Sequence, residues 1–260
     1  MTPLARCTLA ALACAASVRA DCNPGYPCYS AASVVNSASY ASGWLAATTF
    51  ASVFGSLLAD QTLTGSPGSQ DGSGALGGTR VLVNGLPAFI SYVSPGQVNF
   101  VVPSNWSNAA MVTVQLERGN QAGPAVTLAL HDSAPALFQL DAVTAVAAHA
   151  NWTLVTAQSP AHAGEVVTLY ATGLGAYLNP VLDLSVPPSE DPIARRADFQ
   201  LFLGGQPVDS GLISYVGAEP VAVGVYQIDL KLPANVGTNP EVRIALGTRL
   251  SPPGVVLPVE

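Results

Sequence analysis

Three adjacent residues, His131, Asp132 and Ser133, have the side-chain types that a nucleophilic hydrolase uses. Such catalysis needs a serine beside a histidine base that an acidic group orients. Neighbours along a strand or turn point in different directions, so this run predicts no triad. The Gly-x-Ser-x-Gly turn of many hydrolases is also missing from the sequence. We therefore assign no catalytic residue, and we expect His149 and His162 to face solvent near turns.

Acidic side chains could form two other kinds of site. Glycosidases use two carboxylates that face each other across a cleft, but nothing in the sequence pairs a second acid with Glu165 or with Asp229. We expect both to be surface charges. Calcium needs several oxygen ligands in one tight loop. Asp71-Gly72 and Glu190-Asp191 are candidates without the Asp-x-Asp-x-Asp-Gly spacing. We predict no metal site and no cofactor.

The three tryptophans are the best indication of a binding function. An exposed indole offers a flat apolar face to a sugar ring or to a protein partner. Trp106 lies in a predicted turn at residues 104–110 and is our candidate ligand contact. Trp44 and Trp152 are expected to pack from loops onto a core.

The N-terminus has the features of an export signal. A short basic start precedes an apolar run at residues 7–17, and Val18-Arg19-Ala20 resembles a cleavage site. We predict a signal peptide at residues 1–20, with lipoprotein processing at Cys14 as the alternative. The apolar run is too short to span a bilayer, so we expect no membrane insertion of the mature chain. The protein should be secreted, either extracellular or periplasmic.

Removal of the signal peptide leaves two cysteines, Cys22 and Cys28. In an exported chain, two close cysteines with Pro and Gly between them predict a small disulfide loop. No second pair of Cys or His follows at zinc-ligand spacing. We expect residues 21–31 to form an N-terminal extension closed by this loop.

The composition narrows the possible partners. The chain of 260 residues is 49% hydrophobic and only 10% charged, which excludes a solvated disordered chain. Its net charge of −7 disfavours binding to nucleic acid and to anionic membranes. An unknown protein or polysaccharide partner remains.

A strand pattern occurs twice, at residues 97–103 and 227–233. Apolar residues alternate with mostly polar ones, which places the two kinds on opposite faces of a strand. We predict that the apolar set points into two cores: Val98, Phe100, Val102, Ile228, Leu230 and Leu232. The pattern continues without a gap into the next strands, at 111–118 and 242–246.

The repeat predicts an all-β fold of two tandem immunoglobulin-like β-sandwich domains, at residues 32–131 and 132–260. Asn84-Gly85 predicts a tight hairpin turn. Residues 61–78 are expected to be a mobile surface loop, with 176–197 as its counterpart. A last strand is expected at residues 255–259.

Several blocks of sequence resemble one known family. They begin at Asn36 (Asn-Ser-Ala-Ser-Tyr), Tyr92 (Tyr-Val-Ser-Pro-Gly-Gln-Val-Asn-Phe), Ser133 (Ser-Ala-Pro-Ala-Leu-Phe), Ala163 (through Tyr-Ala-Thr-Gly-Leu-Gly) and Val225 (Val-Tyr-Gln-Ile-Asp-Leu-Lys-Leu-Pro). Over about residues 32–260 the chain resembles the uncharacterised Solibacter-type C-terminal domain family of exported bacterial proteins. The resemblance implies a secreted tandem β-sandwich, usually at the C-terminus of larger surface proteins, and no assigned catalytic residues. The chain departs from that pattern at residues 46–49.

These observations predict a non-catalytic β-sandwich protein that mediates interactions or has a structural role at the cell surface or outside the cell. The alternative is a carbohydrate-binding module that uses exposed Trp side chains.

Overall fold

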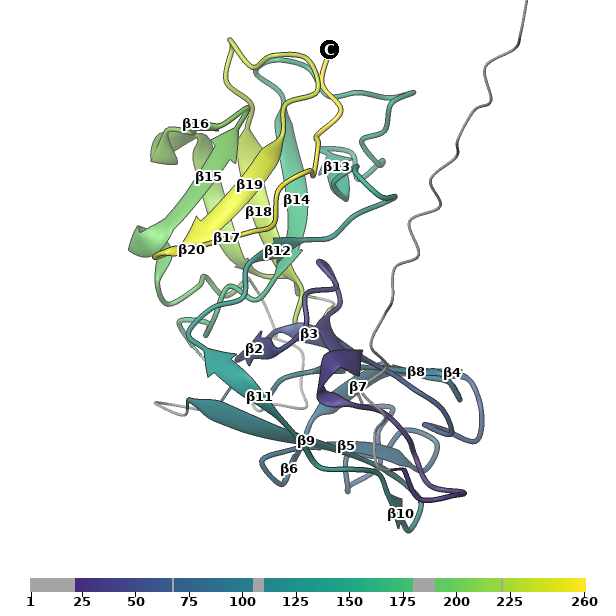
Figure 1. Ribbon diagram of the computed structural model, residues 1–260. Helices are drawn as coiled ribbons and strands as arrows, with labels where there is room; N and C mark the ends of the chain where they lie inside the picture. Colours follow the sequence, from purple (N-terminus) through teal and green to yellow (C-terminus); the bar gives the residue numbers. More distant parts are fainter. Residues whose placement is uncertain (1–21, 67, 105–109, 180–189, 221) are drawn as a thin grey trace, which may run out of the picture.

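The N-terminal half folds into two packed sheets, as the ribbon diagram of the computed structural model shows (Figure 1). The structure describes residues 22–66, 68–104, 110–179, 190–220 and 222–260, so the predicted signal peptide lies outside the described residues. One sheet has the order β1-β3-β8-β7-β4, with strands β1 Val34–Asn36, β3 Phe50–Phe54, β4 Leu63–Thr64, β7 Phe89–Val93 and β8 Gln97–Val101. The other has the order β2-β11-β9-β5-β6, with β10 beside β9. Its strands are β2 Trp44–Ala46, β5 Thr79–Val83, β6 Leu86–Pro87, β9 Met111–Arg118, β10 Gln121–Ala122 and β11 Val126–His131.

The C-terminal half repeats this plan. Its first sheet has the order β12-β14-β18-β17, with β13 beside β14, and comprises β12 Ala136–Leu137, β13 Ala147–His149, β14 Val166–Thr172, β17 Ile213–Ala218 and β18 Tyr226–Lys231. Its second sheet has the order β16-β15-β19-β20, formed by β15 Phe199–Leu203, β16 Gln206–Pro207, β19 Val242–Leu246 and β20 Arg249–Leu250. Three short 3₁₀ turns complete the described elements: η1 Ala31–Ser33, η2 Arg196–Asp198 and η3 Ser210–Leu212. The predicted all-β class with two tandem sandwiches is confirmed.

The two copies of the repeated pattern occupy equivalent strands. β8 lies between β3 and β7, and β18 lies between β14 and β17. All six apolar residues of the pattern are buried, each with at most 1% of its surface exposed. Each copy therefore supplies an interior strand of its sheet, with its apolar set in the core.

The polar positions of the repeat also correspond. Asn99 and Asp229 lie on the outer faces of their sheets, and each accepts two side-chain hydrogen bonds within 2.9 Å. The donors are Ser52 and Gln97 in the first copy, and Thr168 and Gln227 in the second. Asp229 is thus half-buried and bonded across strands, rather than the simple surface charge expected from the sequence.

The predicted Asn84-Gly85 turn is confirmed. It joins β5 to β6, and both residues have positive φ, 47° and 83°. Gly204 and Gly205 do the same between β15 and β16, with φ of 56° and 77°. A two-residue turn of this kind matches the twist of the flanking strands.

Three local expectations differ from the structure. Residues 255–259 form isolated bridges rather than a strand, and Pro258, which lacks an N–H, interrupts any ladder there. The predicted loop at 61–78 contains β4 and the buried Leu76. In the second loop, Tyr177 and Ile193 bridge each other and are buried in the core.

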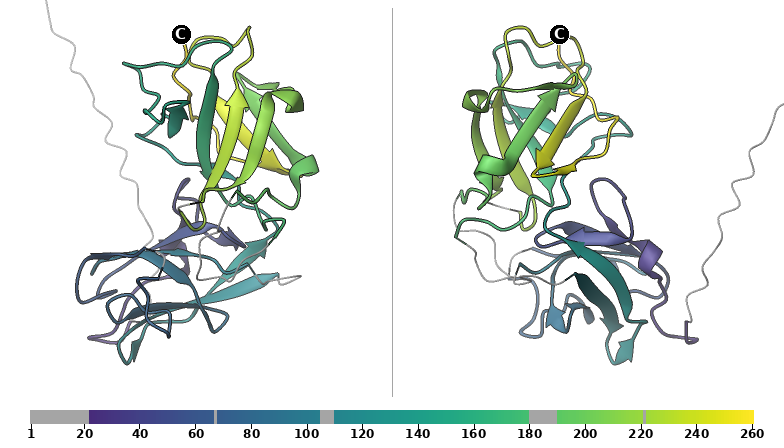
Figure 2. Two further views of the ribbon diagram at one scale, coloured as in Figure 1. Left: turned by 180° about the vertical axis from the view of Figure 1, so that it is seen from behind. Right: turned by 60° about the vertical axis from the view of Figure 1, so that its left-hand side comes forward.

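The linker between the sandwiches is fixed by backbone contacts. It runs through Ala134, whose N–H donates to the Gly173 carbonyl at 2.8 Å. The Asn36 side-chain amide donates to the Ala134 carbonyl at 3.1 Å. Figure 2 shows one sandwich above the other, with the strands of the two running in different directions. Segments far apart in the sequence therefore hold one short peptide in place.

A second set of contacts crosses the junction through buried hydroxyl groups. The Thr48 hydroxyl lies 2.8 Å from the Gly175 carbonyl, and the fully buried Tyr226 hydroxyl contacts both. The Thr172 hydroxyl accepts from the Phe50 backbone N–H at 2.7 Å and donates to the Gly224 carbonyl at 2.8 Å. A small apolar cluster covers these bonds: Phe89, Val101 and Val223, with Phe50 packed against it.

Four of the sequence blocks that carry the family resemblance meet at this junction. They are the blocks that contain Asn36, Ala134, Gly173 and Tyr226. The contacts described above account for these residues by packing and hydrogen bonding between the sandwiches, so the blocks specify how the two units are joined.

Candidate functional site

The structure separates the side chains of His131, Asp132 and Ser133. The His131 ring stacks on Trp44 with ring centroids 5.2 Å apart. Asp132 accepts hydrogen bonds from Arg195 at 2.8 Å and from Arg249 at 3.3 Å. Ser133 is buried and its hydroxyl lies 3.4 Å from the Leu246 carbonyl. The three side chains of this run therefore contact different partners.

The acidic calcium candidates are occupied by hydrogen-bond donors. One Asp71 oxygen accepts from the Ser73 hydroxyl at 2.6 Å and from the backbone N–H groups of Ser73 and Ala75, and these bonds hold its pKa below the usual range. Asp191 is buried and accepts from the backbone and side chain of Asn179. Within the described ranges, no group of three or more His, Cys, Asp or Glu residues could hold a metal ion.

A cluster that the sequence did not predict forms around His149, at the end of β13. Its Nδ1 lies 2.5 Å from a carboxylate oxygen of Glu165, and its Nε2 lies 3.3 Å from the Ser159 hydroxyl. These three residue types in this order of contact resemble a catalytic triad. The expectation that His149 faces solvent is wrong, because its side chain is only 13% exposed.

The details of this cluster favour an ion pair. Nε2 also lies 3.1 Å from the Ser159 carbonyl, which only accepts, so both ring nitrogens face acceptors and the arrangement favours the doubly protonated ring. A general base needs a free lone pair on Nε2. Pro160 follows Ser159 and has no N–H for an oxyanion, and the Ser159 N–H already donates to Thr156. The arrangement stabilises a protonated histidine.

The ion pair should make stability depend on pH. The hydrogen bond with Glu165 raises the pKa of His149 above its ordinary 6.5. Burial would raise the pKa of Glu165, but bonds from His149 and the His162 N–H outweigh it and lower the pKa below 4.5. A raised histidine pKa stabilises at low pH and the effect disappears as pH rises through it, whereas a lowered carboxylate pKa stabilises at higher pH. The His149–Glu165 pair therefore contributes most to stability between pH 4.5 and pH 6.5.

We expect His149→Gln to lose this contribution while keeping a polar side chain. The difference in free energy of unfolding between the wild type and the variant should be largest near pH 5.5 and should shrink above the raised histidine pKa, as linkage requires for about one proton. Urea unfolding at a series of pH values measures it. A difference that stays constant with pH would show that His149 acts by packing alone.

The three tryptophans have different environments. Trp106, the candidate ligand contact, lies outside the described residues. Trp44 is half-buried against His131, close to the expectation. Trp152 is 67% exposed, so the expected packing onto a core is wrong. Its φ of 66° places it in a tight turn after β13, which points the indole away from the sandwich.

Cys22 and Cys28 are joined by a disulfide bond, with their Cα atoms 5.2 Å apart. The Cys28 and Ser56 backbones exchange hydrogen bonds at 2.9 Å, so the closed loop is attached to the first sandwich just after β3. Its role is structural.

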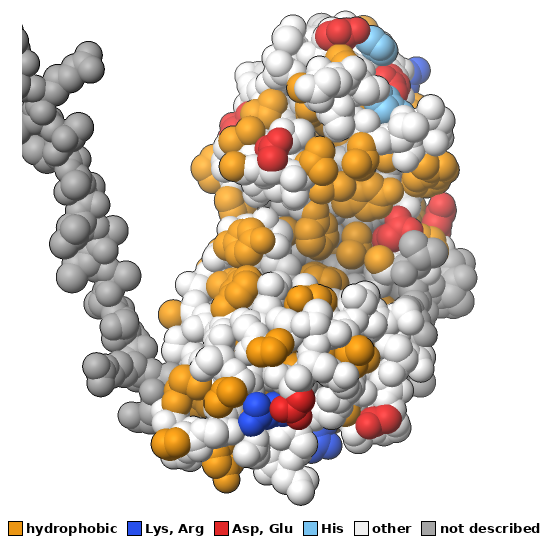
Figure 3. Space-filling model, turned by 90° about the vertical axis from the view of Figure 1, so that its right-hand side faces the viewer, with side chains coloured by type: hydrophobic (Ala, Val, Ile, Leu, Met, Phe, Trp, Pro, Cys, Tyr) orange, Lys and Arg blue, Asp and Glu red, His pale blue; other side chains and the backbone are white. Residues whose placement is uncertain are grey.

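Two of the cavities lined by described residues could take a ligand. The first, of about 480 Å³, lies at the junction and is lined by Ser37, Ala38, Ser39 and Tyr40 of the first sandwich and by Phe138, Gln139, Leu140, Asp141 and Ala142 of the second. We call it the junction groove. Figure 3 shows hydrophobic side chains gathered across the middle of one face, where the two sandwiches meet. Tyr40 is 68% exposed.

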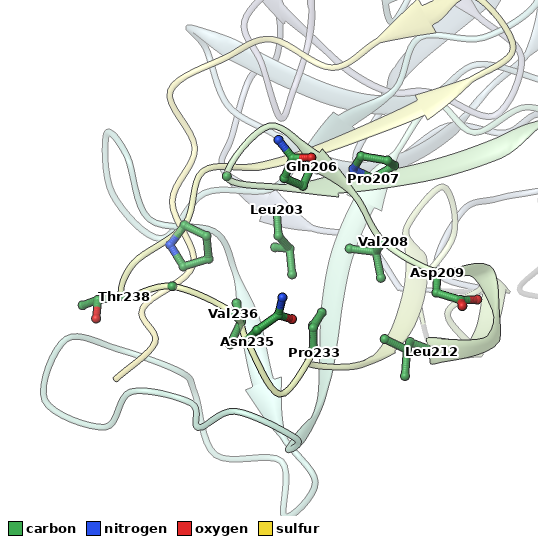
Figure 4. Close-up of a pocket in the computed structure, with 13 residues that line it drawn as sticks. Leu203, Gln206, Pro207, Val208, Asp209, Leu212, Pro233, Asn235, Val236 and Thr238 are labelled. Carbon is green, nitrogen blue, oxygen red and sulfur yellow. The ribbon is translucent and has the colours of Figure 1, made fainter.

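The second cavity, of about 570 Å³, lies in the C-terminal sandwich between the β15–β16 hairpin and the segment after β18. Figure 4 shows Leu203, Val208 and Asn235 around it. Its described lining has no aromatic side chain. Asp209 at its rim is engaged as the cap of η3, accepting from the Gly211 N–H at 2.8 Å. The junction groove therefore offers the more distinctive chemistry.

No family model matches the chain, and no curated protein matches it. Solved structures resemble it distantly. The surface glycan-binding protein PbSGBP-B from Prevotella bryantii is 14% identical with a TM-score of 0.27, over 88% of this chain and 42% of that chain. SGBP-B of the Bacteroides ovatus mixed-linkage glucan utilization locus, in complex with a mixed-linkage heptasaccharide, is 10% identical with a TM-score of 0.34. The match covers 84% of this chain and 44% of that chain. The N-terminal Ig1-2 module of the Drosophila receptor protein tyrosine phosphatase DLAR is 12% identical with a TM-score of 0.22. The match covers 84% of this chain and 94% of that chain.

The chain thus spans less than half the length of either glycan-binding protein. Since all three TM-scores lie below 0.5, no function is transferred from them. Among the described residues, no helix has the length and apolar character needed to cross a membrane.

Proposed function

We propose that this chain is an exported, non-catalytic protein that mediates contact at the cell surface or outside the cell. One observation carries the proposal: the two most exposed aromatic side chains of the described residues, Tyr40 and Trp152, lie on loops of two sandwiches that hydrogen bonds join. Exposed rings on a rigid scaffold suit binding. The disulfide between Cys22 and Cys28 is consistent with an oxidising compartment.

The side chains that could support hydrolysis have structural partners instead. His149 is bonded to Glu165 and to the Ser159 carbonyl, Asp132 pairs with two arginines, and Asp229 accepts bonds across the sheet. The purified mature chain should therefore give no turnover when screened against hydrolase substrates. Robust turnover that disappears in Ser159→Ala or His149→Gln would overturn the proposal.

Carbohydrate binding is the second candidate. Exposed aromatic rings favour it, because sugar rings stack on flat apolar faces. Saturable retention of the mature chain on a polysaccharide gel would support it. The resemblance to the Solibacter-type family remains a prediction, and membership in that family is compatible with either function.

A further inference from the structure

The junction groove is built from both sandwiches, and its position follows from the fixed linker. One wall is the turn at residues 37–40, and the other is the segment at 138–142. The Gln139 amide donates to the Ala38 carbonyl at 3.4 Å across the groove. Its volume of about 480 Å³ is within the range of small-ligand sites. The groove is therefore preformed.

Tyr40 stands in this groove in an unusual backbone conformation. Its φ is 57°, a region that bulky residues rarely adopt and that glycine adopts freely. The turn itself is held by Asn36, whose carbonyl accepts from the Tyr40 N–H at 2.8 Å and whose side chain accepts from Ala38 and Ser39. None of these bonds needs an aromatic side chain. Backbone strain of this kind often accompanies a functional side chain.

The Tyr40 ring is supported on one side and open on the other. Its centroid lies 6.4 Å from that of Phe54, with 30° between the planes, while the side chain stays 68% exposed. Such a ring can stack against the C–H face of a pyranose. Nearby polar groups, the Gln139 amide and the Ser39 hydroxyl, belong to the groove lining and could meet sugar hydroxyls.

The charge of the groove limits the class of sugar. Asp141 lines it, and backbone N–H groups of Val143 and Thr144 hold the pKa of this carboxyl below its usual range, so it is charged at neutral pH. The described lining contains neither Lys nor Arg. The whole chain is also acidic, with a net charge of −7. Acidic polysaccharides would be repelled.

We infer that the junction groove binds a neutral polysaccharide, with Tyr40 as the stacking platform and Gln139 as a polar contact. This inference rests on the carbohydrate-binding form of the proposed function. It assigns the ligand to the junction rather than to an exposed tryptophan.

The test is affinity electrophoresis of the mature chain in gels that contain single polysaccharides. The neutral set is hydroxyethylcellulose, xyloglucan, galactomannan, mixed-linkage glucan and soluble starch, and the acidic controls are polygalacturonate and alginate. We expect retention on at least one neutral polymer and on neither acidic one. Retention only on the acidic polymers, or on none of the seven, would overturn the inference.

The variants locate the site. Tyr40→Gly should weaken retention about tenfold, the usual effect of removing an aromatic anchor. Its melting temperature should change little, because relief of the positive φ offsets the lost contact with Phe54. Tyr40→Phe should retain binding. Tyr26→Ala removes another exposed tyrosine, outside the groove, and serves as the matched control.

Unchanged retention in Tyr40→Gly would overturn the inference. If retention disappears instead in Trp152→Ala or Trp106→Ala, the groove is not the site although the protein still binds carbohydrate. The proposed function fails separately, through turnover in the hydrolase screen.

Discussion

Replacing Gly173 with alanine should lower the free energy of unfolding by about 4 kcal/mol or more, a size reached only by severe steric or core defects. Gly173 has a φ of 74°, and an added Cβ would overlap the carbonyl group of Ala134 and lie 3.1 Å from its Cα. The obstacle is backbone, and the hydrogen bonds of Ala134 to Gly173 and Asn36 hold it there. To relieve the overlap between the added Cβ and the Ala134 carbonyl, the linker would have to move and the junction would have to open.

Gly164→Ala is the matched control. Gly164 has a similar φ of 80°, but no atom lies within 4 Å of the position that an added Cβ would occupy. It should lose only the backbone contribution, about 1–2 kcal/mol for an alanine at positive φ. Urea unfolding followed by far-ultraviolet circular dichroism measures both. Equal losses in the two variants would show that the contact with Ala134 does not constrain the fold.

Phe100→Ala should cost about 3–5 kcal/mol of unfolding free energy, as deletion of a packed aromatic side chain usually does. Phe100 is fully buried in β8, the central strand of its sheet, and belongs to the core shared by both sheets of the first sandwich. β3 and β7 flank β8 on both sides, so the cavity left by the ring should not collapse easily.

Phe54→Ala provides the comparison on the same sheet. Phe54 is only half-buried, and its ring meets Tyr40 on the outer face. Its truncation should cost about 1 kcal/mol, in line with partial burial. Chemical denaturation of the wild type, Phe100→Ala and Phe54→Ala ranks their free energies of unfolding. A loss in Phe100→Ala no larger than that in Phe54→Ala would contradict the assigned core.

Local sequence patterns were sufficient to predict features that depend on a single strand or turn. The alternation at Val98, Phe100 and Val102 predicted their burial because a strand with one face on a core has a period of two. Asn84-Gly85 predicted a tight turn because both residues tolerate positive φ. Neither inference needs a contact between distant parts of the chain.

Side-chain partners over longer separations were not predictable. His149 was expected in solvent, yet it meets Glu165 because β13 pairs with β14, and that pairing is a property of the sheet. Trp152 was expected against a core, but its turn directs it outward. At residues 255–259 the expected strand is replaced by isolated bridges, since a proline cannot donate to a ladder.

The sequence by itself determined the strand class, the duplication, the tight turns and the buried face of each repeat, because these depend on residues within a few positions of one another. Only the tertiary structure decided how the two sandwiches meet. The contact of Gly173 with Ala134 fixes the linker, and the bond from Asn36 and the groove beside Tyr40 join segments from different sandwiches. Such contacts depend on the relative placement of two folded units, which no periodicity in either unit encodes.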